Sequence, residues 1–353
     1  MDRVWIIMIL LLFSRSFCVS GAGKVEYKVL LNPGDAAPAD SASYMYDDKW
    51  FVDAFEEFSE MLDGKCPMSL KRAEFLVEWA YLQGNVAYED FCQQIDSVTG
   101  ILNAFIELNN LRRYKTGVNY ALFEYFTKPN PLNGYTPMTY DFEDFRGKND
   151  FRKLFVSKLM KEKKGQCMSL CLYYKILCDE LEGEGYLAMA PSHIYIKHIG
   201  EDGKWVNIDL TNGHFARDEW IMETLGVSTE SIKNNVYMCA LSETETIAIM
   251  LIQLANAYVQ KYGGYDYFTL NCAKKALQYY PSCPVALMVA SNTYAELGMN
   301  YVRKIGKVPS EFIFRIHNGY VNANKEIERI GAKCLSDGEY ERLVEKALKK
   351  MGR

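Results

Sequence analysis

The feature that most constrains this chain of 353 residues is a cysteine at the point where a charged turn becomes a helix. Cys167 follows Gly165 and Gln166, and apolar residues then recur at i, i+3, i+4 and i+7. That spacing predicts an amphipathic helix with one buried stripe, and Cys167 lies at its N-terminal end. The unpaired N–H groups and positive dipole end of a helix favour an anion there, so Cys167 is the first candidate nucleophile. The stripe comprises Leu170, Cys171, Tyr174, Leu177, Cys178 and Leu181.

A base and a carboxylate for this thiol are expected from the segment that follows. Residues 192–199 and 204–210 each alternate like a strand, and the sequence Gly-Glu-Asp-Gly between them is typical of a turn. The resulting β-hairpin brings His193, near the start of its first strand, close to Asp209, near the end of its second. The chain therefore offers nucleophile, base and orienting carboxylate in the order Cys167, His193, Asp209.

These segments resemble the core of the transglutaminase-like, papain-related superfamily. The resemblance rests on Gly-x-Cys opening a helix, on the histidine before alternating apolar residues, and on Gly-x-Trp-Val-x-Ile-Asp. Asp209 follows His193 by 16 residues and Trp205 follows it by 12, similar to the family's hairpin. The resemblance covers about residues 150–215, and it implies an α+β fold with a cysteine helix, an antiparallel sheet and a Cys-His-Asp triad. Two departures, at residues 184–189 and at Leu210 in place of proline, are expected to alter contacts to the substrate.

The chemistry that the resemblance implies is acyl transfer. Cys167 would attack an amide carbonyl, His193 would protonate the leaving amine, and the Cys167 N–H would help to hold the oxyanion. Hydrolysis of a peptide or isopeptide is the preferred outcome, because no sequence feature selects an amine acceptor over water. No metal or organic cofactor is implied. The alternative is a non-catalytic module that docks a protein, peptide or cell-wall ligand, with Cys167 as a buried small hydrophobe.

The N-terminal segment predicts export. Residues 1–22 combine Arg3, an apolar run over residues 4–13 and small residues at 20–22, which is typical of a secretory signal peptide. The run is too short to span a bilayer, so an exported, periplasmic or extracellular protein without stable membrane insertion is expected. Nine cysteines remain after residue 22, and the odd number leaves at least one unpaired thiol, which suits a nucleophile.

Charge argues against one class of partner. The formal net charge is −5 and no basic stripe emerges to neutralise phosphates, so nucleic acid is not expected as a ligand. The densest basic run precedes Gly165 and is either a solvated helix face or a rim that attracts substrate. It comprises Lys158, Lys161, Lys163 and Lys164.

Three regions are expected after the signal peptide. Helical periodicity runs from Trp50 to about Phe126, the turn-rich segment 128–137 is a connection or a rim of the cleft, and residues 151–160 form a helix. Further on, Leu287, Ala290 and neighbouring residues resemble degenerate tetratricopeptide-like helices, which implies a surface for a protein partner.

Of the other histidines, His214 is a candidate for the cleft wall, His198 is expected to be exposed and His317 is expected to be structural. The expected boundaries are 23–127 for a helical N-terminal region, 128–242 for the core and 243–353 for the tetratricopeptide-like region.

Overall fold

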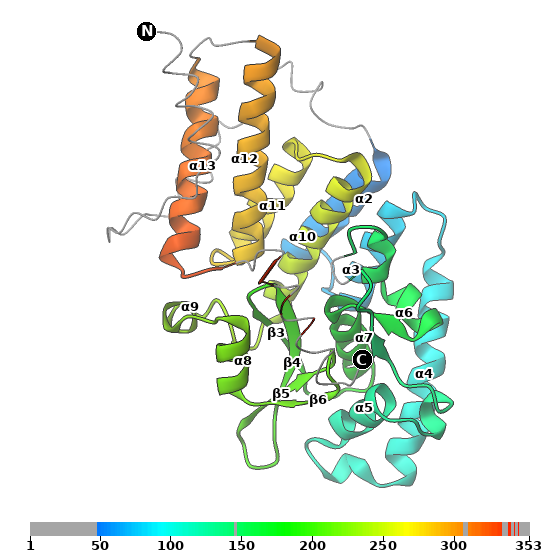
Figure 1. Ribbon diagram of the computed structural model, residues 1–353. Helices are drawn as coiled ribbons and strands as arrows, with labels where there is room; N and C mark the ends of the chain where they lie inside the picture. The colour runs from blue at the N-terminus through cyan, green and yellow to red at the C-terminus, as the bar shows by residue number, and fades with distance from the viewer. Residues whose placement is uncertain are drawn as a thin grey trace.

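The computed structural model describes residues 48–144, 147–305 and 310–333, together with residues 338, 339, 342 and 345. The expected signal peptide lies outside the described residues. Within them the fold is α+β, with a small antiparallel sheet surrounded by many helices (Figure 1). Among the described residues, no helix combines the length and apolar character needed to cross a membrane.

The helical N-terminal region forms as the periodicity predicts. Its first two helices begin at capping residues: the Asp48 carboxylate accepts the Trp50 N–H, and the Ser69 hydroxyl accepts the Arg72 N–H. The apolar faces of these helices are buried, with Phe51, Ala54 and others in the core. The elements are α2 (Lys49–Leu62), α3 (Leu70–Tyr81), α4 (Tyr88–Leu108), η4 (Leu111–Arg113), α5 (Gly117–Thr127) and η5 (Pro131–Asn133).

The segment leading to the cysteine differs from the single helix expected over residues 151–160. It consists of a 3-10 turn, η6 (Phe151–Leu154), and a separate helix, α6 (Val156–Glu162). Phe155 between them is extended, and the backbone N–H groups of Val156 and Ser157 donate to glutamate side chains of α3. The partners of these N–H groups lie about 80 residues away in the sequence. Local periodicity therefore could not locate the break.

The cysteine helix α7 (Cys167–Glu180) occupies the centre of this part of the molecule. A short parallel pair, β1 (Thr139–Tyr140) and β2 (Lys164–Gly165), precedes it. Helices α3, α4, α5 and α6 contact one side of α7, and strands β3 and β4 contact another. More than the predicted stripe is consequently buried: Leu172, Tyr173 and Ile176 lie in the core as well. A helix that is apolar on most of its faces is buried on most of its faces.

The sheet has the order β3 (Tyr186–Ala190), β4 (His193–Ile199), β5 (Trp205–Asp209) and β6 (His214–Ala216), and every neighbouring pair is antiparallel. The predicted hairpin is confirmed as β4 and β5. Its register pairs Ile196 with Ile208 and Ile199 with Trp205.

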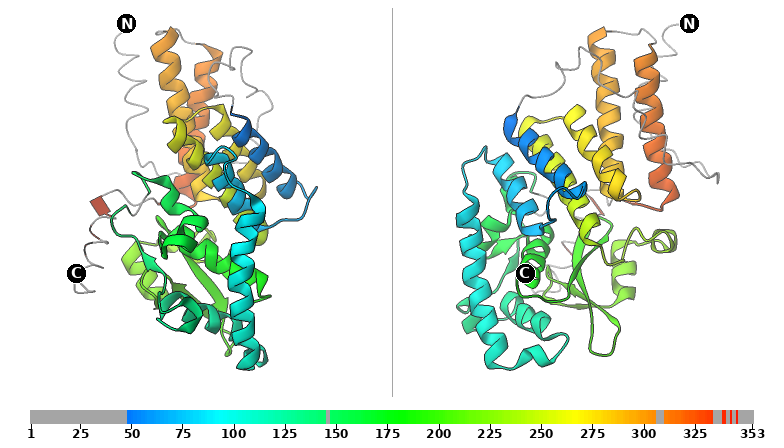
Figure 2. Two further views of the ribbon diagram at one scale, coloured as in Figure 1. Left: turned by 90° about the vertical axis from the view of Figure 1, so that its right-hand side faces the viewer. Right: turned by 180° about the vertical axis from the view of Figure 1, so that it is seen from behind.

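The remaining helices follow the sheet. α8 (Asp218–Leu225) and α9 (Thr229–Lys233) are short, and α10 (Glu243–Tyr262) packs against α2, α3 and α11 (Tyr267–Tyr279). α12 (Pro284–Ile305) packs against α11 and α13 (Glu311–Arg329). Figures 1 and 2 show α12 and α13 side by side, extending away from the sheet, with α10 and α2 between them and the α7 region.

Candidate active site

The cysteine is held at the first position of α7 by the residue before it. Gln166 is fully buried, and its side-chain amide Nε2 donates to the backbone oxygens of Asp141 and Asp144 at 3.0 and 2.9 Å. Its backbone N–H donates to the Ser169 hydroxyl at 3.0 Å. A Cβ at Gly165 would lie 2.5 Å from that hydroxyl, so only glycine fits there. These contacts fix the N-terminus of α7 against residues 141–144.

Cys167 itself is partly exposed, whereas Cys171 and Cys178 on the same helix are buried. Burial raises the pKa of the Cys171 thiol well above its usual value, and it raises the pKa of Cys178 to about 12. Those two thiols therefore stay protonated. As the first residue of α7, Cys167 also has a backbone N–H without an intrahelical acceptor, as an oxyanion donor requires.

The structure places His193 between Cys167 and Asp209. His193 opens β4 after a two-residue connection in which Ser192 has a φ of 56°, and its backbone pairs with Ala190. Its Nε2 lies 3.5 Å from Asp209 Oδ1, and the thiol of Cys167 is near enough to contribute to raising the pKa of His193. Continuing the register of β4 and β5 by one pair sets Asp209 opposite Tyr195, which makes His193 its diagonal neighbour on the same face. The three residues singled out from the sequence thus form one chain of contacts.

The electrostatics of the pair follow from burial and charge. Burial alone would lower the pKa of His193, but the hydrogen bond and charge of Asp209, together with those of Cys167, raise it to about 10. Burial alone would raise the pKa of Asp209, but the positive charge of His193 and several hydrogen bonds hold it far below its usual range. At neutral pH the arrangement is an imidazolium paired with a carboxylate.

Two further residues bind Asp209, and sequence reasoning did not assign them. Thr211 donates its backbone N–H and its hydroxyl to Asp209 Oδ1 at 3.0 and 2.6 Å. Asn212 donates its side-chain amide to Oδ2 at 2.7 Å. An aspartate followed two residues later by a donor is the pattern of an Asx turn, which was the available signal.

The remaining histidines are not part of this cluster. His198 was expected to be exposed near the turn, and this is wrong: only 4% of it is accessible, and burial lowers its pKa. It belongs to a strand that is buried along most of its length. His214 is exposed on β6, with its backbone paired to Asp209. His317 lies in α13, and burial lowers its pKa.

A second group of buried acids lies away from the triad. Glu74 and Glu78 lie on successive turns of α3, and they are 2% and 1% accessible. Glu74 accepts the Val156 N–H at 3.2 Å, and Glu78 accepts the N–H and the hydroxyl of Ser157. Burial raises the pKa of both carboxyl groups, most strongly that of Glu74, whose pKa the charge of Glu78 raises further. The pair caps the N-terminus of α6, and its surroundings favour the protonated form of the carboxyl groups.

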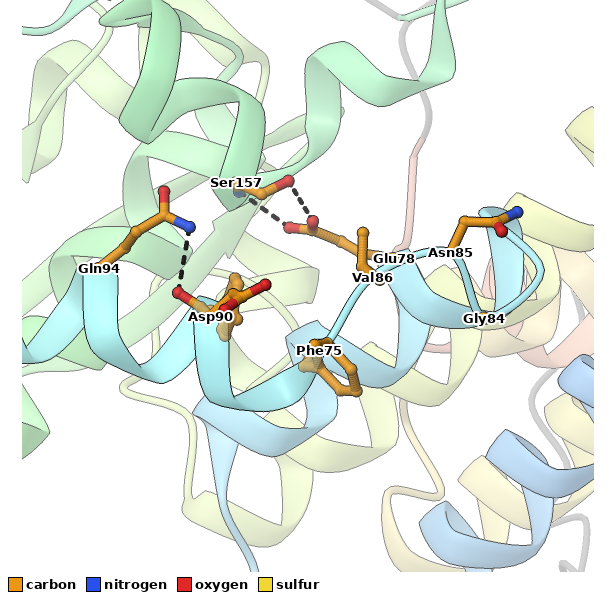
Figure 3. A pocket seen from close by; sticks show the side chains of 10 residues that line it. Phe75, Glu78, Gly84, Asn85, Val86, Asp90, Gln94 and Ser157 are labelled. Atoms are coloured by element: carbon orange, nitrogen blue, oxygen red, sulfur yellow. Dashed lines mark hydrogen bonds between the residues drawn. The ribbon is translucent and has the colours of Figure 1, made fainter.

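Glu78 and Ser157 also line a pocket of about 540 Å³ between α3, α4 and α6 (Figure 3). None of the triad residues contributes to it. Its walls otherwise mix apolar residues with the amides of asparagine and glutamine and one aspartate, and comprise Phe75, Gly84, Asn85, Val86, Ala87, Asp90, Phe91 and Gln94.

Comparisons of the chain with protein-family models, with curated proteins and with solved structures find no match. Among the described residues, the side chains of histidine, cysteine, aspartate and glutamate do not gather into a group of three or more that would hold a metal ion. The geometry of Cys167, His193 and Asp209 is therefore the basis for inferring function.

Proposed function

We propose that this protein is a cysteine acyl-transfer enzyme that hydrolyses the amide bond of a peptide or isopeptide. The observation that carries the proposal is the position of His193, which lies 3.5 Å from the carboxylate of Asp209 and whose pKa is raised by both Asp209 and the neighbouring Cys167. A thiol at a helix N-terminus, next to an imidazole oriented by an acid, is the arrangement that nucleophilic catalysis requires.

The order of elements supports a papain-like core of the transglutaminase-like type. The cysteine opens a helix that packs against an antiparallel sheet, and the histidine and aspartate come from adjacent strands of that sheet. Exported localisation and a protein partner on the C-terminal helices remain proposals drawn from the sequence.

Each step of the reaction has a residue for it. The Cys167 sulfur attacks the carbonyl carbon, and the carbonyl electrons move onto oxygen, where the N–H of Cys167 donates to the oxyanion. The C–N bond breaks as His193 transfers its proton to the departing nitrogen, which leaves a thioester and a neutral imidazole. His193 then removes a proton from water, the water oxygen attacks the thioester, and the thiolate leaves. Asp209 stabilises each imidazolium that forms.

The partial exposure of Cys167 supports access for a carbonyl, because a fully enclosed thiol such as Cys171 could not reach one. The neighbouring Lys164 is engaged with Asp141 and Glu143 at 3.2 and 3.5 Å. We therefore assign it to the local ion-pair network rather than to substrate attraction.

The test uses peptide aldehydes and fluorogenic peptide and isopeptide libraries. The parent protein is expected to form a covalent adduct at Cys167 and to release product, and Cys167→Ala is expected to do neither. Cys92→Ala is the matched control, because Cys92 is a partly exposed thiol on α4 and should be dispensable. Product release that persists in Cys167→Ala, or a parent protein that forms no adduct, would contradict the proposal. Added amines that enter the product would identify transfer to an amine instead of water.

A further inference from the structure

The carboxylate of Asp209 is held on both oxygens by the turn that follows it. Oδ1 accepts from the backbone and hydroxyl of Thr211 and faces His193 Nε2. Oδ2 accepts from the amide of Asn212 at 2.7 Å, and the same amide nitrogen lies 3.2 Å from the Thr211 hydroxyl. The turn is closed by a bond from the Gly213 N–H to the Asp209 backbone oxygen at 2.9 Å, with φ at Gly213 of 68°.

Two of these contacts fall on the oxygen that faces His193, and among the residues that the structure describes only Asn212 donates to the other oxygen. Asp209 is 3% accessible, so water does not readily replace a lost partner of Oδ2. Without the Asn212 amide, Oδ2 would be left without that donor, and rotation of the carboxylate toward other donors would carry Oδ1 away from the imidazole. The 3.5 Å separation from His193 is already long, and this pairing has little tolerance for such rotation.

The chemical type of the donor also fits a role in orientation. An amide donates a hydrogen bond without adding charge, so the negative charge of Asp209 remains for His193. A lysine or arginine at the same place would pair with the carboxylate itself and compete with the imidazolium. The charge-assisted bond from Asn212 is short, as expected for a strong contact.

We propose that Asn212 is a positioning residue for the triad, and that its side-chain amide fixes the Asp209 carboxylate in the orientation that pairs with His193. The inference rests on the proposed function, because it concerns the same triad. Asn212 touches neither the thiol nor the imidazole in this arrangement and acts through Asp209 alone. Its side chain is partly exposed, so it can be replaced without opening the core.

The test is a titration of the histidines by NMR in ¹⁵N-histidine-labelled protein. The chain has four histidines, so His193→Ala identifies the resonance of His193 by its absence. In Asn212→Ala the pKa of His193 is expected to fall by about one unit or more, the size expected for loss of one charge-assisted hydrogen bond. The rate of Cys167 alkylation at pH 7 should fall about tenfold. Asn109→Ala removes an exposed asparagine amide at the end of α4, away from the triad, and should change neither quantity.

A merely structural role would lower the melting temperature and leave the titration unchanged. An unaltered His193 pKa in folded Asn212→Ala would therefore overturn the inference. If the alanine variant is too unstable to titrate, Asn212→Ser provides the same test, because its shorter hydroxyl does not reach Oδ2. The proposed function fails separately, when the parent protein shows no histidine-dependent thiol reactivity. The inference alone fails when the parent shows that reactivity and Asn212→Ala retains it in full.

Discussion

Two groups of buried carboxylates in this molecule shift their proton affinities in opposite directions. Asp209 is 3% accessible and its pKa is held far below the usual range, whereas Glu74 and Glu78 are 2% and 1% accessible and their pKa values are raised. Burial acts in the same direction on all three acids. The difference comes from partners: an imidazolium and neutral donors face Asp209, while Glu74 and Glu78 face each other and the end of a helix.

The surroundings of Asp209 stabilise its charged form, whereas the surroundings of Glu74 and Glu78 favour the protonated form. Asp209 keeps its negative charge and so keeps His193 positive, which suits an imidazole that must donate a proton to a leaving group. Burial and the charge of Glu78 raise the pKa of Glu74, and the two glutamates together satisfy the first N–H groups of α6. Chemistry is therefore expected at the first group and stability at the second.

Replacing Asp209 by asparagine removes the carboxylate that faces His193, and this change has the largest expected effect. Burial of His193 remains but the carboxylate is gone, so the pKa of His193 should fall steeply from about 10. Catalysis by Cys167 should fall by up to about 10⁴-fold, the loss known for the equivalent change in a serine triad. Turnover of a substrate from the library and NMR titration measure the two effects. A His193 pKa that stays near 10 would show that the carboxylate does not control the imidazole.

Replacing Glu78 by alanine removes the cap of α6. The N–H and hydroxyl of Ser157 lose their acceptor, and the free energy of unfolding should fall by about 2 kcal/mol. Urea denaturation at pH 7 measures the change. Glu57→Ala is a comparison on α2, where the lost ion pair with Arg72 is partly exposed and a smaller effect is expected. If both variants lost the same free energy of unfolding, the capping of α6 by Glu78 would contribute no more than an exposed ion pair.

Replacing Glu74 by glutamine tests whether the raised pKa of Glu74 makes the free energy of unfolding depend on pH. The pKa of Glu74 is raised in the folded state, so its contribution to stability is full below the usual value of 4.5 and is lost as the pH rises through the folded pKa. Glutamine imitates the neutral acid at every pH. Urea denaturation from pH 5 to pH 9 should show a flatter profile for Glu74→Gln than for the parent. Parallel profiles in the two proteins would show that the pKa of Glu74 is not raised in the folded protein.

Asp209 provides the opposite sign when the same denaturation series is extended to acid pH, below the usual carboxyl pKa. Its pKa is lowered in the folded state, so its contribution is present above the usual value of 3.8 and is lost as the pH falls through the folded pKa. Acid unfolding and alkaline weakening thus report on different acids of one molecule.

Replacing Ser157 by alanine is the smallest change. It removes the hydroxyl donor to Glu78 and leaves the backbone N–H bond intact, so a loss of about 1 kcal/mol is expected. Thermal and urea unfolding measure it, and Ser157→Thr, which keeps a hydroxyl, serves as control. A loss as large as that of Glu78→Ala would show that the hydroxyl, rather than the helix cap, dominates.

The two groups also differ in how far the sequence predicts them. The order and spacing of Cys167, His193 and Asp209 indicate that they meet, because a helix start and a hairpin have regular local geometry. The hairpin forms as predicted, and Nε2 of His193 does lie beside Asp209. The Glu74 and Glu78 pair was not predicted, since its partners come from residues about 80 positions later and no local period encodes that distance.

The errors share a cause. The nearby turn led to the expectation that His198 is exposed, yet it shares a strand face with the buried Ile194 and Ile196, and both faces of β4 are covered. The same enclosure buries α7 on more than the predicted stripe. Sequence periodicity reports which face is apolar, but it does not report how many layers cover the polar one.

The most direct test of the central claim is the rate of alkylation of Cys167 as a function of pH, followed by mass spectrometry in the parent and in His193→Ala. Cys171 and Cys178 are internal controls, because burial keeps their thiols protonated. The account predicts fast labelling of Cys167 at pH values well below the usual thiol pKa of about 8.5, and loss of that labelling in His193→Ala. Slow labelling that is the same in both proteins would contradict it and would identify Cys167 as a structural residue.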